Sequence, residues 1–152
     1  MKRFFVLLPL LMFFIIPVYA QSTNKMYDSV LAKKLKADDY GMKNYVLVLL
    51  KSGSNASTDK TLKDSIFAGH FKNIGRLSEN GSLVVAGPFG KNDKYRGLFV
   101  LNADNFDEAK KMLETDPAIH NKFLEPELYM WYGSAALQET LEIHNKIQKS
   151  KF

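Results

Sequence analysis

Two ionisable side chains, a histidine and an aspartate far apart in the chain, are the strongest candidates for chemistry. His70 lies within "SIFAGHFKNIGRL", a stretch whose other large residues are mostly apolar. At about 100° per residue, His70 falls inside the apolar stripe of the helix that this segment predicts. A buried ring N–H without an acceptor costs about 1–3 kcal/mol, so an acceptor must reach it. A backbone carbonyl is one candidate, and a carboxylate is the other. The stripe comprises Leu62, Ile66, Phe67, Phe71, Ile74 and Leu77.

The stripe of this predicted helix is interrupted by two polar residues. Lys63 and Asn73 project within it. Part of this helix face is therefore expected to border a polar cavity.

Asp116 directly precedes Pro117, an arrangement typical of a helix start. The carboxylate of such an aspartate accepts a free backbone N–H of the first turn. Capping uses one carboxylate oxygen. The other oxygen remains able to orient an imidazole, so two interpretations stay open: a cap alone, or a cap that also holds a histidine.

A histidine held by a carboxylate is suited to proton transfer. Histidine takes and returns a proton near neutral pH, and a carboxylate on its far nitrogen fixes the tautomer. If Asp116 orients His70, we hypothesise proton transfer in an isomerase- or lyase-type reaction on a small molecule whose C–H or O–H is already acidic, beside a carbonyl or on a phenol. The alternative is a non-catalytic ligand-binding or stress-associated module. A catalyst needs a reachable imidazole, whereas a structural one is sealed and bonded on both nitrogens.

Other residues are candidates for lining a pocket around this pair. His120 follows Asp116 by four residues, and with His70 the two would form a metal site of two histidines and one carboxylate. A surface or pocket-rim histidine is favoured, because these residue types often occur together by chance. Nucleotide binding is not predicted, because "AGPFGKNDKYRG" lacks the spacing of a dinucleotide fingerprint or a phosphate loop. No metal and no other cofactor is predicted either. The remaining substrate-binding candidates are Gly87 and Pro88 at a strand end, Arg96 as an anion contact, and Trp131.

The expected elements follow the order strand, helix, strand, strand, helix, strand. Two right-handed crossovers of this kind predict an α+β, ferredoxin-like fold, a four-stranded antiparallel sheet with both helices on one face. Its first and third strands lie in the centre. We expect strands at 44–50, 82–88, 97–103 and 127–133, helices from 58 or 59 to 80 and at 105–115, and one helical turn at 116–123.

The central strands are apolar at consecutive positions, so both of their faces need cover. The two helices cover one face only. A second copy of the chain is the economical cover for the other face, and a homodimer is predicted.

The ends of the chain predict export and two additions to the core domain. Residues 1–20 combine a basic start, an apolar middle and a small residue at a cut after Ala20, which is typical of a secretory signal peptide. We expect a secreted or periplasmic protein without a stable membrane anchor after cleavage. Residues 21–43 form an extension with a short helix, 44–133 the domain, and 134–152 a helical tail with Leu137, Leu141, His144 and Ile147 along one stripe.

Charge and cysteine content exclude other classes of protein. The formal net charge is +5, and signal cleavage removes two of these positive charges. The lysines are spread along the chain, so nucleic-acid binding is not predicted. The absence of cysteine excludes thiol nucleophiles, iron–sulfur clusters and cysteine zinc sites.

The order of several short motifs resembles the YCII-related family of dimeric α/β-barrel proteins. These are "H-x10-G-x4-A-G-P", here His70, Gly81 and Ala86-Gly87-Pro88, followed by the "DP" of Asp116 and Pro117. The resemblance extends from about Tyr45 to Gly133. It implies a homodimer in which His70 and Asp116 form a catalytic pair facing a pocket for a small-molecule ligand.

Overall fold

The computed structural model describes residues 24–91 and 93–150. The predicted signal peptide lies outside these residues. None of the described helices is long and apolar enough to cross a membrane.

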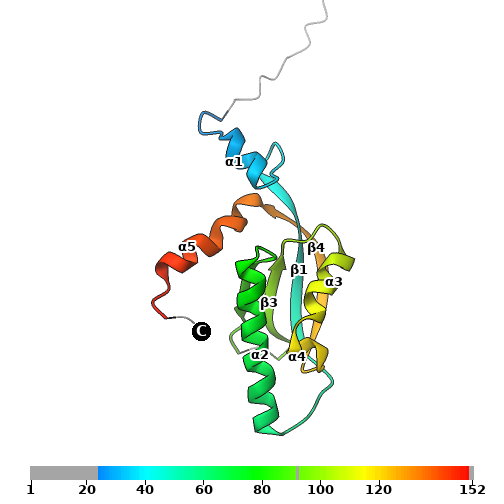
Figure 1. Cartoon of the computed structure of the whole chain (residues 1–152). Coiled ribbons are helices and arrows are strands. Elements are labelled where there is room, and N and C mark those ends of the chain that lie inside the picture. Colours follow the sequence, from blue (N-terminus) through cyan, green and yellow to red (C-terminus); the bar gives the residue numbers. More distant parts are fainter. Residues whose placement is uncertain (1–23, 92, 151–152) are drawn as a thin grey trace, which may run out of the picture.

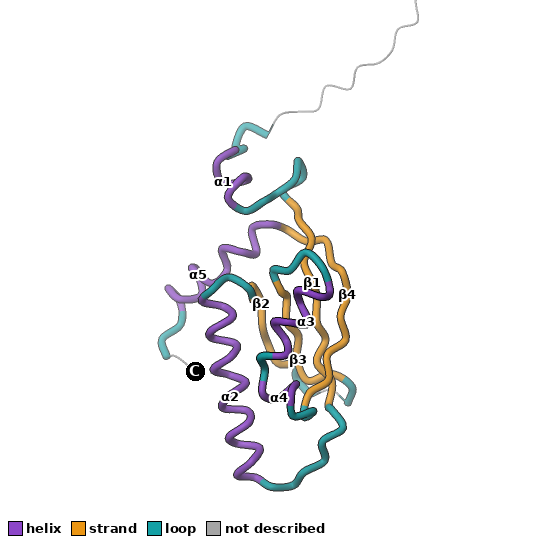
Figure 2. Tube along the Cα trace, turned by 45° about the vertical axis from the view of Figure 1, so that its right-hand side comes forward, coloured by secondary structure: helices purple, strands orange, loops and turns teal. Residues whose placement is uncertain are grey.

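Four antiparallel strands form one sheet in the order β2-β3-β1-β4, with the long helix α2 and the shorter α3 and α4 on one face (Figures 1 and 2). This is the strand order of the ferredoxin-like fold, so the predicted fold class and the central position of β1 and β3 are confirmed. The elements are α1 Ser29–Lys34, β1 Met42–Ser52, α2 Lys60–Glu79, β2 Leu83–Pro88, β3 Tyr95–Leu101, α3 Phe106–Glu114, α4 Pro117–His120, β4 Leu124–Ser134, the 3-10 helix η1 Ala135–Glu139 and α5 Thr140–Ile147.

Strands β1 and β4 are longer than their apolar runs predict. They pair without a break from Met42 opposite Ser134 to Ser52 opposite Leu124. Backbone hydrogen bonds between neighbouring strands do not depend on side-chain polarity, so pairing continues into polar residues at both ends. Strand β3 is also shifted, because it begins at Tyr95 rather than at Gly97.

The hydrophobic core lies between the sheet and the helices. Alternate residues of β1 point into it, Val46, Val48 and Leu50, which are all at most 3% exposed. Helix α2 begins at the cap Asp59, whose carboxylate accepts the backbone N–H of Leu62 at 3.0 Å. The other helical and strand positions of the core are Leu77, Leu83, Phe99, Leu101, Ala109, Leu113, Ala118 and Leu124.

The other face of the sheet is only partly covered, and we call it the open face. Leu47 and Leu49 of β1 alternate with the core residues and are half-buried. On the neighbouring strand β4, Tyr129 and Trp131 are 47% and 37% exposed. The open face is therefore apolar and accessible within the described chain, as the apolar runs of the central strands indicated.

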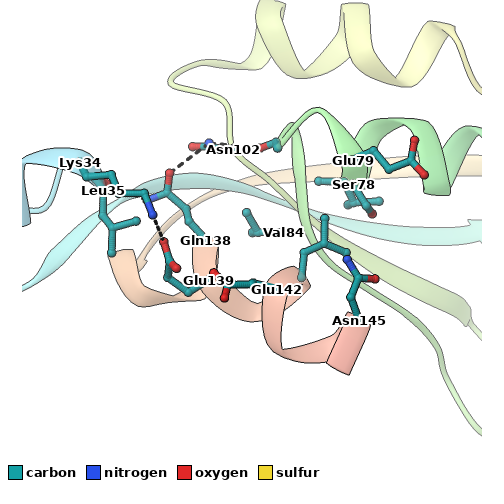
Figure 3. A pocket seen from close by; sticks show the side chains of 13 residues that line it. Lys34, Leu35, Ser78, Glu79, Val84, Asn102, Gln138, Glu139, Glu142 and Asn145 are labelled. Carbon is teal, nitrogen blue, oxygen red and sulfur yellow. Dashed lines mark hydrogen bonds and ion pairs between the residues drawn. The ribbon is translucent and has the colours of Figure 1, made fainter. Parts of the chain in front are cut away.

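The N-terminal extension and the C-terminal tail contact each other at the end of the sheet where β1 begins. Lys34 Nζ forms an ion pair with Glu139 Oε1 at 3.0 Å, and Gln138 Nε2 donates to the backbone carbonyl of Leu35 at 2.7 Å. Asn102, after β3, donates to Gln138 Oε1 at 3.2 Å (Figure 3). A groove of about 480 Å³ lies between these segments, the end of α2 and β2. We call this region the terminal junction.

One buried lysine lies beside this junction. Lys43 Nζ donates to Asn102 Oδ1 and lies 5.1 Å from the centre of the Tyr45 ring. Burial lowers the pKa of the Lys43 ammonium from its ordinary value. Tyr45 in turn donates its hydroxyl to the backbone carbonyl of Ser134 at 3.0 Å, which ties β1 to the start of the tail.

The tail uses only half of its predicted apolar stripe. Leu137 and Leu141 are partly buried, whereas His144 and Ile147 are exposed. Leu141, His144 and Ile147 all lie on α5, and only the start of this helix is partly covered by the rest of the described chain.

Candidate active site

His70 and Asp116 meet in the core. The Nδ1–H of His70 donates to Asp116 Oδ2 at 2.7 Å, since a carboxylate has no hydrogen to give. The His70 side chain is 8% exposed and that of Asp116 is 1% exposed. The predicted contact of the two groups is therefore confirmed, and the acceptor of the imidazole is the carboxylate rather than a backbone carbonyl.

Asp116 serves two partners with its two oxygens. Its Oδ1 accepts the backbone N–H of Ala118 at 2.8 Å and, at 3.4 Å, that of Ile119, which caps α4. Its Oδ2 is left for the imidazole. The second interpretation of this aspartate is therefore confirmed, because it caps α4 and also holds the histidine. Because the cap fixes the carboxylate, the acceptor is in place without any movement of α4.

Three aromatic rings surround the imidazole. Phe99 of β3 stacks on it, with ring centres 5.9 Å apart and planes inclined by 24°. Phe67 and Phe71 of α2 meet it edge-on at 5.9 and 5.5 Å. The aromatic contacts restrict the ring to one orientation, in which only Nδ1 finds a polar partner among the described residues.

The second ring nitrogen, Nε2, is the atom available for chemistry. It makes no hydrogen bond to any residue that the structure describes. Among these residues, Asn73 Nδ2 is the one side-chain polar atom that is both fully buried and without a hydrogen-bond partner. His70 Nε2 also lacks a partner, so it is not fully buried and belongs to the small part of the side chain that stays accessible. An accessible nitrogen opposite a carboxylate-bonded one is the arrangement of a general base.

A polar network next to the pair was not predicted from the sequence. Asn73 lies one helical turn after His70, and Thr115 directly precedes Asp116. The Asn73 Oδ1 accepts hydrogen bonds from Arg76 Nη2 at 2.8 Å and from Thr115 Oγ1 at 3.1 Å. This network joins α2 to the segment that carries Asp116. The polar Asn73 within the apolar stripe was the signal for it.

The predicted pocket residues are dispersed over the molecule. Trp131 pairs with Tyr45 on β1 and lies on the open face, whereas His70 lies among core residues on the helix-covered face. Gly87 and Pro88 do end β2, which is an edge strand. His120 is exposed at the end of α4. In the described part of the chain no three His, Cys, Asp or Glu residues come close enough to hold a metal ion.

Arg96 is the predicted binding residue that lines a cavity. A cleft of about 310 Å³ lies at the end of the sheet where β1 ends, opposite to the terminal junction. Lys63, the other polar residue of the apolar stripe, also lines it. Phe67 is a shared wall, because its ring faces Phe123 of the cleft at 6.2 Å and His70 at 5.9 Å. We call this the cationic cleft, lined by Ser52, Gly53, Asn55, Lys63, Phe67, Arg96, Phe123 and Leu124.

Neither this cleft nor the groove at the terminal junction is lined by His70. The imidazole is therefore next to the cationic cleft, with the Phe67 ring in between. The segments outside the predicted domain lie at the other end of β1 and do not cover the cleft.

Gly53 holds one wall of the cleft in place by close backbone contact. Its N–H donates to the Phe123 carbonyl at 2.9 Å, and a Cβ at this position would overlap the backbone carbonyl of Lys122. We expect Gly53→Ala to lower the free energy of unfolding by about 1–3 kcal/mol, because the backbone must shift. Urea denaturation measures this.

Gly75→Ala is the matched control for that substitution. A Cβ at Gly75, inside α2, meets nothing within 4 Å. This variant should be more stable than the wild type by about 0.5–1 kcal/mol. Equal effects of the two substitutions would contradict the close approach at Gly53.

Comparisons with known proteins found a similarity to a solved structure. No family model matches the chain, and no curated protein matches it. Among solved structures, it is similar to 5-chloro-2-hydroxyhydroquinone dehydrochlorinase from Burkholderia phenoliruptrix, in complex with 2,5-dihydroxybenzoquinone. The TM-score is 0.42 and the identity 17%, over 57% of this chain and 92% of that chain. The assignment to the ferredoxin-like fold rests on the strand order itself, and the resemblance to the YCII-related family stays a prediction.

Proposed function

We propose that the protein is a small-molecule acid–base enzyme in which His70 transfers protons. The hydrogen bond between His70 Nδ1 and Asp116 Oδ2 supports this proposal, because it directs the lone pair of the ring to Nε2. Nε2 makes no hydrogen bond to a described residue, so its lone pair is available to accept a proton from a substrate. A purely structural imidazole would be bonded on both nitrogens.

The reaction class follows from what one histidine supplies. A general base contributes about 10²–10⁴-fold, which is enough when the C–H or O–H is already acidic because it lies beside a carbonyl or on a phenol. No step requires a cofactor. An isomerase- or lyase-type reaction on a small aromatic or lactone-like molecule fits this limit.

The test of this proposal is solvent exchange. The protein is incubated in D₂O with a panel of lactones, hydroxyquinones and 1,3-dicarbonyl compounds, and loss of the acidic proton is followed by NMR. We expect at least one compound to exchange faster with the protein than with buffer alone. Exchange at the buffer rate for the whole panel would contradict the proposal.

A second candidate function is a non-catalytic ligand-binding module. The observation that favours it is the deep burial of the pair, since His70 keeps only 8% of its side-chain surface. In this case the pair joins α2 to α4 and the cleft beside it holds a ligand. Binding without any exchange would support this second candidate.

We further propose that the open face pairs with the open face of a second copy. The exposed Tyr129 and Trp131 lie beside the half-buried Leu47, a continuous apolar surface of the kind that homodimers bury. Tyr129→Glu should convert the dimer to a monomer, measured as mass by light scattering.

Met130→Glu is the control for the dimer test. Met130 is 45% exposed on the same strand but points to the opposite face, so its variant should remain a dimer. A wild-type protein that is monomeric at high concentration would overturn the dimer proposal.

The predicted secretion is likewise a proposal. N-terminal sequencing of the protein recovered from its native host checks it, with Gln21 expected as the first residue.

A further inference from the structure

Two cations line the cationic cleft without any acid to balance them. Arg96 and Lys63 make no ion pair with any residue in the described part of the chain, and no Asp or Glu is among the lining residues. The neighbouring acids of β4, Glu125 and Glu127, are both engaged by Lys51, at 3.6 and 3.0 Å. Two positive charges on the same partly apolar surface repel each other, and a bound anion would balance them.

The position of Arg96 results from an irregularity of the sheet. Gly97 pairs with Leu50 and Tyr95 with Lys51, so Arg96 is an extra residue between two consecutive pairs. A β-bulge of this kind turns a side chain out of the regular alternation and is frequent next to functional sites. Without the bulge, Arg96 would share the open face with Leu98, two residues further along β3.

The bulge places the Arg96 guanidinium at the cleft in a fixed orientation. Its Nε donates to Ser52 Oγ at 2.7 Å, and no other side-chain hydrogen bond to a described residue engages it. The two terminal nitrogens are therefore left to bind an oxygen pair, and a carboxylate is the planar group that matches the guanidinium edge.

The cleft also has apolar walls, and backbone hydrogen bonds hold one of them in place. Phe67, Phe123 and Leu124 supply hydrocarbon surface. The wall opposite α2 is fixed by the backbone bonds from Gly53 N to Phe123 O and from Asn55 N to Lys122 O, both 2.9 Å. A volume of about 310 Å³ is at the small end of the range of ligand pockets.

We infer that the cationic cleft binds a small organic anion, with an aromatic or similarly compact apolar body on Phe67 and Phe123 and a carboxylate held by Arg96 and Lys63. This inference goes beyond the proposed proton transfer, because binding at the cleft does not involve His70 Nε2. The inference is tested by binding, so the test gives an answer regardless of whether His70 and Asp116 are catalytic.

The experiment titrates the ¹⁵N-labelled protein with benzoate and, separately, with benzamide, which has the same shape and no charge. Benzoate should give saturable amide shifts at Gly53, Asn55 and Leu124, and benzamide should bind at least tenfold more weakly. A charged hydrogen bond contributes about 1.5–3 kcal/mol, so Arg96→Gln and Lys63→Gln should each weaken benzoate binding about tenfold or more.

Two further variants sharpen the outcome. Lys72→Gln removes an exposed charge from the same helix as Lys63 and should leave the affinity unchanged. Arg96→Lys keeps the charge but loses the planar edge, and should bind benzoate more weakly than the wild type. Amide spectra verify that each variant is folded. Equal binding of benzoate and benzamide, no saturable shift with benzoate, or wild-type affinity in Arg96→Gln would overturn the inference.

Discussion

Replacing His70 by Gln should lower the rate of protein-catalysed solvent exchange about 10²–10⁴-fold. The glutamine amide can donate to Asp116 Oδ2 in place of Nδ1–H, so the carboxylate keeps a partner and the fold should persist. What the variant lacks is a basic nitrogen. The measurement is the exchange rate of the responsive compound, with near-ultraviolet circular dichroism as the check on folding.

His120→Gln is the matched control for this experiment. It makes the same replacement at an exposed histidine on α4, four residues after Asp116, and should leave the exchange rate within about twofold of the wild type. If the His70→Gln variant catalyses solvent exchange at the wild-type rate, His70 is not the base, regardless of the rate measured with His120→Gln.

Asp116→Ala should destabilise the protein through two separate losses. It removes the cap of α4, which contributes about 0.5–2 kcal/mol, and leaves the buried Nδ1–H of His70 without an acceptor, at a further cost of about 1–3 kcal/mol. We therefore expect a loss of about 2–4 kcal/mol in the free energy of unfolding. Urea denaturation monitored by circular dichroism provides the value.

Two other variants separate the parts of this effect. Asn105→Ala removes only the exposed cap of α3, whose side chain accepts the Glu108 N–H at 2.9 Å, and should cost about 1 kcal/mol. Asp116→Asn keeps an oxygen for the α4 cap and should cost less than Asp116→Ala. A loss in Asp116→Ala no larger than that in Asn105→Ala would mean that the bond to His70 contributes nothing to stability.

Local rules placed His70 and Asp116 individually, and the resemblance to the YCII-related family implied that they form a pair. Helical periodicity placed the imidazole on the core side of α2, and the Asp-Pro dipeptide placed a capping carboxylate at the start of α4. An imidazole buried on one element needs an acceptor, and the second oxygen of a capping aspartate is one. Local rules therefore allowed this contact but did not select it, because the two residues lie on different elements and a backbone carbonyl remained an alternative acceptor.

The cationic cleft was predicted only in fragments, because it depends on how the strands pair. Arg96 was a candidate anion contact and Lys63 a sign of a polar cavity, but nothing in their spacing placed them in one cleft. The bulge on β3 brings Arg96 to Ser52, and the register shift that creates it is a property of two strands together. A single sequence does not specify such a register.

The placement of Trp131 shows the same limit. Period-two alternation correctly grouped Trp131 with Tyr129 on one face of β4. Which face turns towards the helices is set by the pairing of Trp131 with Tyr45 rather than with Val46. A shift of one residue would have exchanged the two faces, so a pocket role for Trp131 beside His70 could not be judged from the strand alone.

The tautomer of His70, measured by ¹⁵N NMR of the imidazole nitrogens near neutral pH, decides whether Asp116 orients the ring as a base. We expect a proton on Nδ1 and a lone pair on Nε2 in the wild type. In Asp116→Asn we expect the reverse, because the amide NH₂ then donates to Nδ1. A wild-type ring with its proton on Nε2, or a tautomer unaffected by the Asn substitution, would contradict a base oriented by Asp116.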